Sequence, residues 1–425
     1  MATIFAMSSG QPPAAIAVIR VSGPDAFAAA RSLAGNLPEA RRAGVRKLVD
    51  PTSGVLLDEA LVICFPRPTS ATGEDLCELH VHGGRAVVAA VLAALSGLSG
   101  LRPAEPVEFT RRALTHGRID LSEAEGLGDL LLAETESQRR AALSAAGGAI
   151  SRAVEGWSSR LLDLSARVES MLDFSDEDDV ADVPLESIRA GAALLCSDIE
   201  AILDTPPVER LRDGVVVVLA GPPNSGKSTL LNAMVDRDVA IVSPIAGTTR
   251  DRIEASVVRD GIAYRFTDTA GLALATKDPV EAIGVSLAIE AMSSADIVLW
   301  FGDEPLNDTR AIWLWPRADV RGELTDARRI AVAAPIAQGL LELWELVACR
   351  ASAMLPREDQ LVLNERQRKL CRQCADCLVA AERQNDLLIT ADLLRQARNA
   401  LHGITGASDV EAMLDSLFGK FCIGK

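Results

Sequence analysis

The stretch that decides the fold is Gly221-Pro222-Pro223-Asn224-Ser225-Gly226-Lys227-Ser228, which fits the pattern G-x-x-x-x-G-K-[ST] without a gap. It follows the apolar run Val215–Ala220 and leads into Thr229–Val235, which has the pattern of a helix start. A strand, a glycine turn and a helix N-terminus together form a phosphate-binding loop, because successive backbone N–H groups and the helix dipole face the phosphates. In that setting Lys227 reaches the β- and γ-phosphate oxygens and Ser228 ligates Mg²⁺. The sequence therefore predicts nucleotide binding.

The composition bounds the class of protein. The chain has 425 residues, 48% of them hydrophobic and 24% charged, which suits about two to four globular domains. No apolar stretch approaches the length of a membrane span, and no basic region precedes the N-terminal apolar segment, so no signal peptide is expected. Eight scattered cysteines indicate reduced thiols and a cytoplasmic location. A net charge of −16 argues against general electrostatic binding of nucleic acid.

The periodicity of apolar residues changes along the chain and predicts four segments. Residues 1–118 mix short strand patterns with a helix at Arg85–Leu95, which indicates a compact α/β or α+β domain. Residues 119–210 are helical, residues 211–350 alternate strands and helices around a parallel sheet, and residues 351–425 are helical again. Strands of the parallel sheet are expected at Val215–Ala220, Ile262–Thr267, Ile297–Phe301, Ile312–Trp315 and Ile330–Ala333. We interpret the α/β segment as inserted into one discontinuous helical domain.

Two further motifs suit a nucleoside triphosphatase. Asp268-Thr269-Ala270-Gly271 follows a predicted strand, so Asp268 can hold Mg²⁺ through water and the Gly271 N–H can sense the γ-phosphate. Gly247-Thr248-Thr249-Arg250-Asp251 lies in a loop rich in chain breakers, where a threonine ligates Mg²⁺ only when the loop closes. An ordinary polar loop is the alternative for this second motif.

The base-recognition motif departs from the usual pattern. Guanine specificity normally comes from N-K-x-D, but here the sequence is Pro316-Arg317-Ala318-Asp319, and the usual Ser-Ala base loop is Ala333-Ala334. Only Asp319 remains to accept hydrogen bonds from N1–H and the exocyclic amine of guanine. The link Gly302–Arg310 is also too short for a crossover helix. We therefore expect a shortened domain that lacks one peripheral helix.

Taken together, these motifs and the terminal Phe421-Cys422-Ile423-Gly424-Lys425 resemble the MnmE (TrmE) family of tRNA-modification GTPases. Residues 71–84, 109–125 and 172–178 resemble other motifs of the family, so the resemblance covers nearly the whole chain. It implies an N-terminal folate-binding domain that dimerises, a discontinuous helical domain and an inserted Ras-like P-loop G domain. It also implies GTP hydrolysis with Mg²⁺ and K⁺, the flavoprotein MnmG as partner in a heterotetramer, and modification of the wobble uridine of tRNA at C5 with a tetrahydrofolate-derived carbon.

The resemblance also carries over site residues. It implies a K⁺ site of Asn224, Thr248 and the carbonyl groups of Ser243 and Ile245, with Glu281 orienting the attacking water. A solvated helix charge is the alternative for Glu281. The implied nucleotide-contacting positions are Asn224, Ser225, Gly226, Lys227, Ser228, Thr229, Ser243, Thr248, Thr249, Asp268, Thr269, Ala270, Gly271 and Asp319. The implied folate-binding residues are Arg20, Glu78, Arg118 and Lys425, although Arg118 replaces a more usual lysine and the loop Gly10–Ala15 departs from the family's glycine-rich loop.

Some suggestive residues have simpler explanations. Cys371, Cys374 and Cys377 have the spacing of a metal site, but they lie in a continuous helical pattern without a nearby fourth ligand, so a buried helix stripe is favoured. A structural role is favoured for Cys422 over nucleophilic chemistry. The three tryptophans in strand patterns, Trp300, Trp313 and Trp315, are expected in the core.

Three hypotheses for function remain open at this point. The first is a K⁺-stimulated GTPase that opens and closes its G domains during tRNA modification. The second is a degenerate G domain that binds nucleotide weakly and serves as a scaffold for the flavoprotein. The third is an unrelated P-loop ATPase, which Pro316 and Arg317 keep open. We favour the first, because the residues for hydrolysis are all present.

Overall fold

The structure is a computed structural model that describes residues 2–173, 185–235, 254–268, 290–322, 324, 326–357 and 360–406. The chain forms two compact units. The first contains residues up to Gly128 together with the segment from His402 onward, and the second contains residues from Asp129 to Leu401. In the described part of the chain, no helix combines the length and apolar character needed to cross a membrane.

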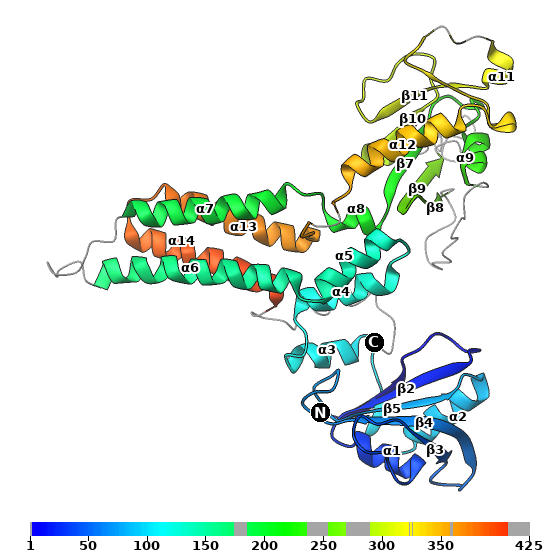
Figure 1. The fold of residues 1–425 in the computed structure, drawn as a ribbon, viewed down its shortest axis with the longest axis vertical. Coiled ribbons are helices and arrows are strands. Elements are labelled where there is room, and N and C mark those ends of the chain that lie inside the picture. The colour runs from blue at the N-terminus through cyan, green and yellow to red at the C-terminus, as the bar shows by residue number, and fades with distance from the viewer. Residues whose placement is uncertain are drawn as a thin grey trace, which may run out of the picture. The chain divides into compact units, whose positions relative to one another are not determined.

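The first unit is built on a six-stranded sheet with the order β3-β4-β5-β2-β1-β6. Its neighbouring strands are antiparallel except for the parallel pair of β1 and β6. Two helices cover one face and bury the apolar residues that alternate along the strands (Figure 1). The strands are β1 (Thr3–Met7), β2 (Ile16–Ser22), β3 (Gly44–Val49), β4 (Leu56–Phe65), β5 (Leu76–His82) and β6 (Leu101–Pro103), and the helices are α1 (Ala26–Ala34) and α2 (Arg85–Ser96). An α+β domain was one of the two predicted classes, and the structure has it.

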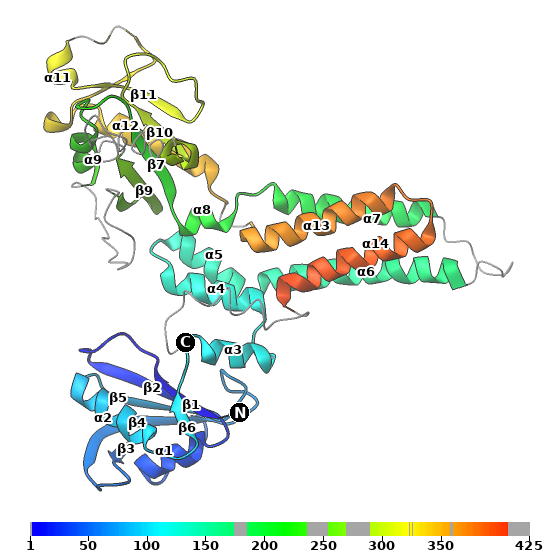
Figure 2. The ribbon, with the colours of Figure 1, turned by 180° about the vertical axis from the view of Figure 1, so that it is seen from behind.

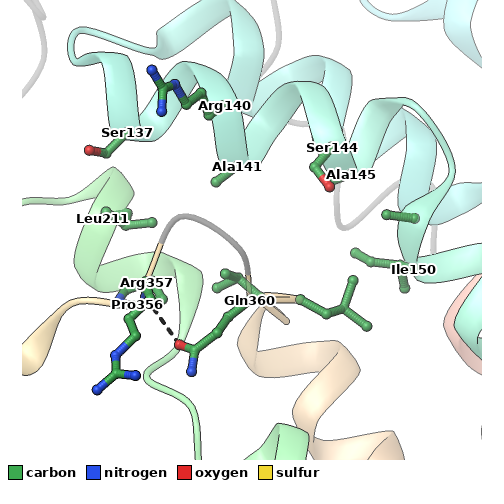
Figure 3. Close-up of a pocket in the computed structure, with 13 residues that line it drawn as sticks. Ser137, Arg140, Ala141, Ser144, Ala145, Ile150, Leu211, Pro356, Arg357 and Gln360 are labelled. Carbon is green, nitrogen blue, oxygen red and sulfur yellow. Dashed lines mark hydrogen bonds between the residues drawn. The ribbon is translucent and has the colours of Figure 1, made fainter.

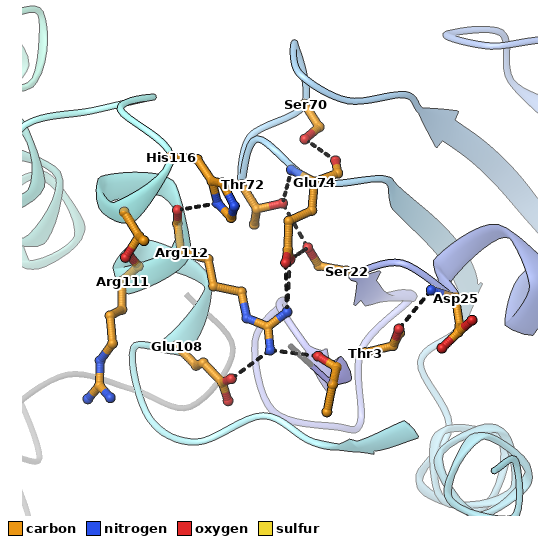
Figure 4. Close-up of polar contacts among 12 residues, drawn as sticks. Thr3, Ser22, Asp25, Ser70, Thr72, Glu74, Glu108, Arg111, Arg112 and His116 are labelled. Carbon is orange, nitrogen blue, oxygen red and sulfur yellow. Dashed lines mark hydrogen bonds and ion pairs between the residues drawn. The ribbon is translucent and has the colours of Figure 1, made fainter. Parts of the chain in front are cut away.

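A buried charged network fixes helix α3 (Glu108–Thr115) to this sheet domain (Figure 4). The guanidinium of Arg112 donates hydrogen bonds to the Glu74 carboxylate at 2.8 and 3.1 Å, to Glu108 at 2.8 Å and to the Ala2 carbonyl at 2.8 Å. Burial raises the pKa of Glu108, but its hydrogen bonds from Arg102 and Arg112 outweigh this effect and lower the pKa to about 2. The network holds α3 because Arg112 on this helix bonds to Glu74 and Ala2 of the sheet domain. Removing one partner would leave a buried charge unpaired, which strongly destabilises a protein.

The second unit contains a set of helices that the α/β segment interrupts. Helix α7, which precedes the α/β segment in the chain, packs along α13, which follows it, and both views show the two side by side (Figure 2). Hydrogen bonds join these stretches: Arg368 donates to the carbonyl oxygens of Leu203 and Thr205, and Arg189 donates to that of Gln384. The helices within this unit are α5 (Glu136–Ala146), α6 (Ala149–Asp173), α7 (Leu185–Leu203), α8 (Val208–Arg212) and α13 (Glu365–Glu382), whereas α4 (Leu121–Leu132) begins in the first unit and α14 (Leu387–Thr405) ends in it. The discontinuous helical domain is thus confirmed, whereas the four predicted domain boundaries stay predictions.

The inserted segment is an α/β domain with a six-stranded sheet of order β12-β11-β10-β7-β9-β8. The five predicted strands form and pair in parallel. They are β7 (Val215–Ala220), β9 (Ile262–Asp268), β10 (Ile297–Trp300), β11 (Ala311–Pro316) and β12 (Ile330–Val332), with helices α9 (Lys227–Val235), α11 (Ala318–Arg321) and α12 (Leu340–Met354) and the 3₁₀ turn η2 (Ala334–Ile336). The sixth strand, β8 (Glu254–Arg259), was not predicted. It pairs antiparallel with β9 through the turn Asp260-Gly261, where both residues have positive φ.

The prediction that this domain lacks a helix between β10 and β11 is confirmed, since residues 301–310 form a connection without a helix. Trp313 and Trp315 alternate in β11 with Ile312 and Leu314, which belong to the main core, so the two tryptophans lie on the opposite face of the sheet. They are only partly buried, as is Trp300. The expectation that these tryptophans are core residues is therefore wrong for Trp313 and Trp315, whereas Trp300 packs against a second buried cluster that includes Val218, Ala220 and Val298.

An arginine packs over Trp313 and Trp315. The guanidinium carbon of Arg329 lies 4.6 and 4.5 Å from the centroids of these two rings, and its side chain is 6% exposed. Arg329 also donates hydrogen bonds to the carbonyl oxygens of Leu314 and Gly302. Ring faces and carbonyl oxygens together compensate for burying the cation. Arg329 therefore holds the connection after β10 against β11.

Candidate nucleotide-binding site

The phosphate-binding loop forms between β7 and α9, as its sequence predicts. Gly221 has a φ of 148° and Gly226 a φ of 99°, which are conformations that favour glycine. A Cβ on Gly221 would also lie 2.7 Å from the Cβ of Phe301, the residue that follows β10. The loop therefore requires glycine at both ends. Gly226 is required for its backbone conformation, and Gly221 both for its backbone conformation and for its close packing against Phe301.

Lys227 is poised inside this loop. Its side-chain nitrogen donates hydrogen bonds to the carbonyl oxygens of Gly221 at 2.9 Å and Pro222 at 2.7 Å, and the residue is 3% exposed. Burial lowers the pKa of Lys227, and the nearby Asp268 carboxylate opposes this effect. The hydroxyl of Ser225 is buried and has no hydrogen-bond partner among the described residues. A cation and an unsatisfied hydroxyl inside one loop suit a phosphate group.

The two residues predicted to hold Mg²⁺ are in contact. The hydroxyl of Ser228, at the start of α9, donates a hydrogen bond of 2.5 Å to Oδ2 of Asp268, at the end of β9. Asp268 is 1% exposed. Because Mg²⁺ binds few protein oxygens and keeps several waters, a hydroxyl and a carboxylate at one point beside the phosphate loop fit this ion.

The base side of the site follows β11. Pro316 ends this strand, and Arg317 adopts a left-handed conformation (φ 58°, ψ 41°) before the short helix α11. Cγ of Arg317 lies 3.8 Å from the position of a Cβ built on Gly226, so its stem lies beside the phosphate loop. Asp319 is exposed in the first turn of α11. The pair Ala333-Ala334 belongs to a tight loop, in which Ala333 and Gln338 exchange two hydrogen bonds of 3.1 Å.

Comparisons with known proteins agree on one family. The family model described as "GTP-binding protein TrmE N-terminus" matches residues 3–118, and that described as "MnmE helical domain" matches residues 121–422. A relative named "tRNA modification GTPase MnmE" from Rhizorhabdus wittichii is 53% identical over 426 residues, which cover 100% of this chain and 96% of the relative. The chain belongs to the MnmE family.

Other relatives and structures extend this finding. Proteins with the same name from Erythrobacter litoralis and Zymomonas mobilis are 50% and 49% identical to the MnmE-family chain, and in both cases 100% of each sequence is covered. Among solved structures, the G domain of the Thermotoga maritima FeoB iron transporter is 21% identical, with a TM-score of 0.26 over 32% of this chain and 98% of that one. At this TM-score the structural likeness supports no inference.

Several positions implied by the MnmE resemblance lie outside the described residues. They are Ser243, Ile245, Thr248, Thr249, Thr269, Ala270, Gly271, Glu281 and Lys425. Thr229 lies on α9, directly after the phosphate loop, and Asn224 lies in the loop with a φ of 58°. The structure thus brings together Ser225, Lys227, Ser228 and Asp268, and it places Arg317 beside them. Arg317 was not among the predicted site residues. Its position beside Asp319 in the base-recognition motif could have identified it.

In the N-terminal unit of the MnmE-family chain, two of the four predicted folate-binding residues lie together. Arg20 on β2 and Glu78 on β5 are direct cross-strand neighbours, and Nε of Arg20 donates a hydrogen bond of 3.0 Å to Glu78. Both lie on the sheet face opposite α1 and α2, because they alternate with core residues. The exposed Arg118 lies near Gly73, where a built Cβ would be 3.3 Å from its Cγ. The carboxylate and guanidinium offer paired donors and acceptors to a heterocycle.

A cavity of about 230 Å³ lies elsewhere, between α5 and the segment that enters α13 (Figure 3). It contains none of the predicted site residues. On α13 itself, Cys371 and Cys374 are buried, and burial raises the pKa of Cys371 to about 12 and that of Cys374 further. These thiols stay protonated at neutral pH, and the buried helix stripe is confirmed for Cys371 and Cys374, whereas Cys377 is only partly buried.

Proposed function

We propose that this chain is a GTP hydrolase that acts in tRNA modification. The observation that carries the proposal is the formed phosphate side, where Lys227 lies inside the loop and Ser228 contacts Asp268. The proposal is further supported by the family, whose compared members are named tRNA modification GTPase. The finer proposal is that the tRNA position modified is C5 of the wobble uridine.

The chain's own residues perform the following parts of hydrolysis. Lys227 exchanges its hydrogen bonds with the Gly221 and Pro222 carbonyls for bonds to phosphate oxygens, and it offsets the charge that develops there. Ser225 supplies a further hydroxyl to the phosphates. Ser228 and Asp268 would hold Mg²⁺, and the ion would supply positive charge beside the reacting phosphate. Glu281 orients the attacking water, and Thr249 and Gly271 respond to the γ-phosphate.

K⁺, folate and the partners belong to the same proposal. Asn224, Thr248 and the carbonyl oxygens of Ser243 and Ile245 hold K⁺, which stimulates hydrolysis as the G domains close on one another. In the N-terminal domain, Arg20, Glu78, Arg118 and Lys425 bind a tetrahydrofolate derivative. A homodimer of this chain works with an MnmG-type flavoprotein on tRNA, in the cytoplasm. The proposed domains are residues 1–118, 119–210, 211–350 and 351–425.

The alternative is a scaffold that binds nucleotide weakly within the same modification complex. The observation that favours it is the base side, where proline and alanine stand in place of residues that hydrogen-bond guanine. We favour the hydrolase because the sequence contains each residue that the proposed reaction requires, and the described phosphate side brings Lys227, Ser228 and Asp268 together.

Hydrolysis assays on the full-length protein separate these functions. We expect GTP hydrolysis that is faster in K⁺ than in Na⁺ and that is lost in Lys227→Ala. Absence of hydrolysis together with intact binding to the flavoprotein would support the scaffold, and faster hydrolysis of ATP would support an unrelated ATPase. In cells that lack the protein, wild type should restore the modified wobble uridine and Lys227→Ala should not. Equal restoration by both would contradict a role for phosphate binding.

A further inference from the structure

Two cysteines face each other in the sheet core of the N-terminal unit, and neither has a part in the proposed function. Cys64 on β4 and Cys77 on β5 are direct cross-strand partners, and their sulfur atoms are 3.8 Å apart. Both are free thiols, and the residues are 4% and 0% exposed. We propose that this pair is a site of reversible oxidation, at which a peroxide converts the two thiols into a disulfide that links β4 to β5.

The geometry of the two strands suits a disulfide. Facing residues of antiparallel strands have Cα atoms about 4.5–5.5 Å apart, and disulfides join Cα atoms about 4.4–6.8 Å apart. Small side-chain movements therefore bring the two sulfur atoms to bonding distance without a change of register. The pair lies one position from the end of the β4–β5 ladder, where Phe65 pairs with Leu76. Because both cysteines are buried, only an oxidant as small as hydrogen peroxide suits them.

The surroundings of the two thiols differ and assign a role to each. The hydrogen bond from the Cys77 thiol lowers the pKa of Cys64 against the effect of burial, and the charge of Arg31 on α1 lowers it further. The same hydrogen bond, together with burial, raises the pKa of Cys77. The thiolate is the nucleophilic form of cysteine. Cys64 is therefore the sulfur that attacks the oxidant, and Cys77 is the sulfur that completes the disulfide.

The reaction balances with hydrogen peroxide as the oxidant. The Cys64 thiolate bonds to one peroxide oxygen as the O–O bond breaks, and the departing hydroxide takes up the proton that Cys64 released, which gives a sulfenic acid and water. The Cys77 sulfur then attacks the Cys64 sulfur as the S–O bond breaks, and the departing hydroxide takes up the Cys77 proton as a second water. Both sulfur atoms are oxidised and both peroxide oxygens are reduced. A thiol reductant restores the two thiols by exchange.

The disulfide would close residues 65–76 into a loop. This segment contains Glu74, which accepts hydrogen bonds from Arg112 of α3 and from Ser22 of β2 (Figure 4). A covalent link between the strands at the two ends of the segment restricts its local opening. Oxidation would therefore strengthen the attachment of α3 to the sheet domain.

The test treats the full-length protein with excess hydrogen peroxide, blocks the remaining thiols by alkylation and cleaves the chain after glutamate. Glu74 lies between the two cysteines, so they leave in separate peptides unless a disulfide joins them. We expect mass spectrometry to find the joined Cys64 and Cys77 peptides in most chains and to find them separated after treatment with dithiothreitol. Hydrogen exchange of the amides in residues 65–76 should slow about threefold or more in the oxidised protein.

Internal and variant controls separate this pair from the other cysteines. Cys371 and Cys374 are also buried, about one turn apart on α13, and should stay reduced in the same sample because burial raises the pKa of both. Cys77→Ala leaves Cys64 without a second thiol, so Cys64 should persist as a sulfenic acid that dimedone labels. Cys64→Ala should leave Cys77 unlabelled. Oxidised glutathione is much larger than peroxide and should react with neither.

Two results with the wild-type protein would overturn the inference without any variant. Peroxide could leave Cys64 and Cys77 as free thiols, or it could convert Cys64 to a sulfinic acid without joining the two peptides. The two cysteines would then be only small apolar residues of the core. A disulfide that leaves the exchange of residues 65–76 unchanged would overturn the effect on α3, and dimedone labelling of Cys77 in Cys64→Ala would contradict the roles assigned to the two thiols.

Discussion

The phosphate side of the nucleotide site and its base side lie at the same edge of one sheet, but they are built differently. On the phosphate side, main-chain groups and glycine conformations decide the geometry, and Lys227 and Ser228 complete it at fixed positions in one motif. On the base side, side chains from separate loops would have to meet the base, and of the usual ones only Asp319 is present. A site built on backbone geometry tolerates little change in sequence, whereas one built on side chains can be altered residue by residue.

The support of the base side has changed as well. Arg329 and two tryptophans hold the connection after β10, where a helix is missing. That connection begins at Phe301, which touches Gly221 of the phosphate loop. The connection after β10 therefore packs directly against the phosphate loop. The base side and the phosphate side share this contact, so their separate contributions to nucleotide binding can be tested by substitutions on each side.

The largest effect is expected on the phosphate side. Lys227→Ala removes a buried ammonium group that would bond to phosphate oxygens, so affinity for GTP should fall by about 100-fold or more. Calorimetric titration of the full-length protein measures this. Lys227→Met keeps most of the length of the side chain but removes its charge. It should lose affinity for GTP equally, which would assign the effect to the ammonium group and not to side-chain size. If either variant bound GTP within about threefold of wild type, the phosphate side would not dominate binding, which contradicts the prediction.

The next effect concerns the support of the base side. Arg329→Met removes the cation that lies over Trp313 and Trp315 together with its hydrogen bonds to the Leu314 and Gly302 carbonyls, so the G domain should lose about 2–4 kcal/mol of stability. Urea unfolding followed by tryptophan fluorescence reports this, because both rings border the change. The matched control is Arg328→Ala, whose exposed side chain also lies over Trp313 and should have no measurable effect. Equal unfolding midpoints for the two variants would show that Arg329 does not stabilise the connection after β10.

A smaller effect isolates selectivity. Asp319→Ala removes the acceptor for two donors of guanine, so the preference for GTP over ATP should fall about tenfold, while affinity for ATP stays the same or rises. Competition with fluorescent GTP measures both affinities in one experiment. A preference that survives this substitution would mean that another group reads the base, and the base side would need to be reassigned.

The smallest effect is the removal of Mg²⁺. Because Ser228 and Asp268 lie on the phosphate side, Mg²⁺ held there would contact the phosphates and not the base, so chelation should weaken the binding of GTP and ATP by the same factor, roughly 3- to 10-fold. Ser228→Ala should show the weakened affinity in Mg²⁺ and little further loss on chelation. Different factors for the two nucleotides would contradict a clean separation between the phosphate and base sides.

Much of the fold could be predicted because its signals are local. The parallel strands are short apolar runs bounded by breakers, and the phosphate loop is one continuous motif. The missing helix followed from the length of the link between β10 and β11. Strand β8 was missed, although Val257-Val258 and Asp260-Gly261 carry a hairpin signal, because β8 is the antiparallel edge strand of an otherwise parallel sheet.

The long-range contacts could not be predicted. Arg329 lies in a separate segment from Trp313 and Trp315, and the pair Arg328-Arg329 has the pattern of solvated charges, so nothing in the local sequence predicts its contact with the two rings. The contact between Arg317 and the phosphate loop likewise joins two turns that are almost a hundred residues apart. In the N-terminal unit, the neighbours Arg20 and Glu78 depend on strand register, which no local pattern of either strand determines.

The central claim is that the phosphate side binds the nucleotide while Asp319 keeps a preference for guanine on an altered base side. The most direct test is displacement of fluorescent GTP from the wild-type full-length protein by GTP and by ATP in Mg²⁺. We predict that both displace it and that GTP does so at a concentration about tenfold or more below that of ATP. Equal displacement by the two nucleotides, or tighter binding of ATP, would contradict the account.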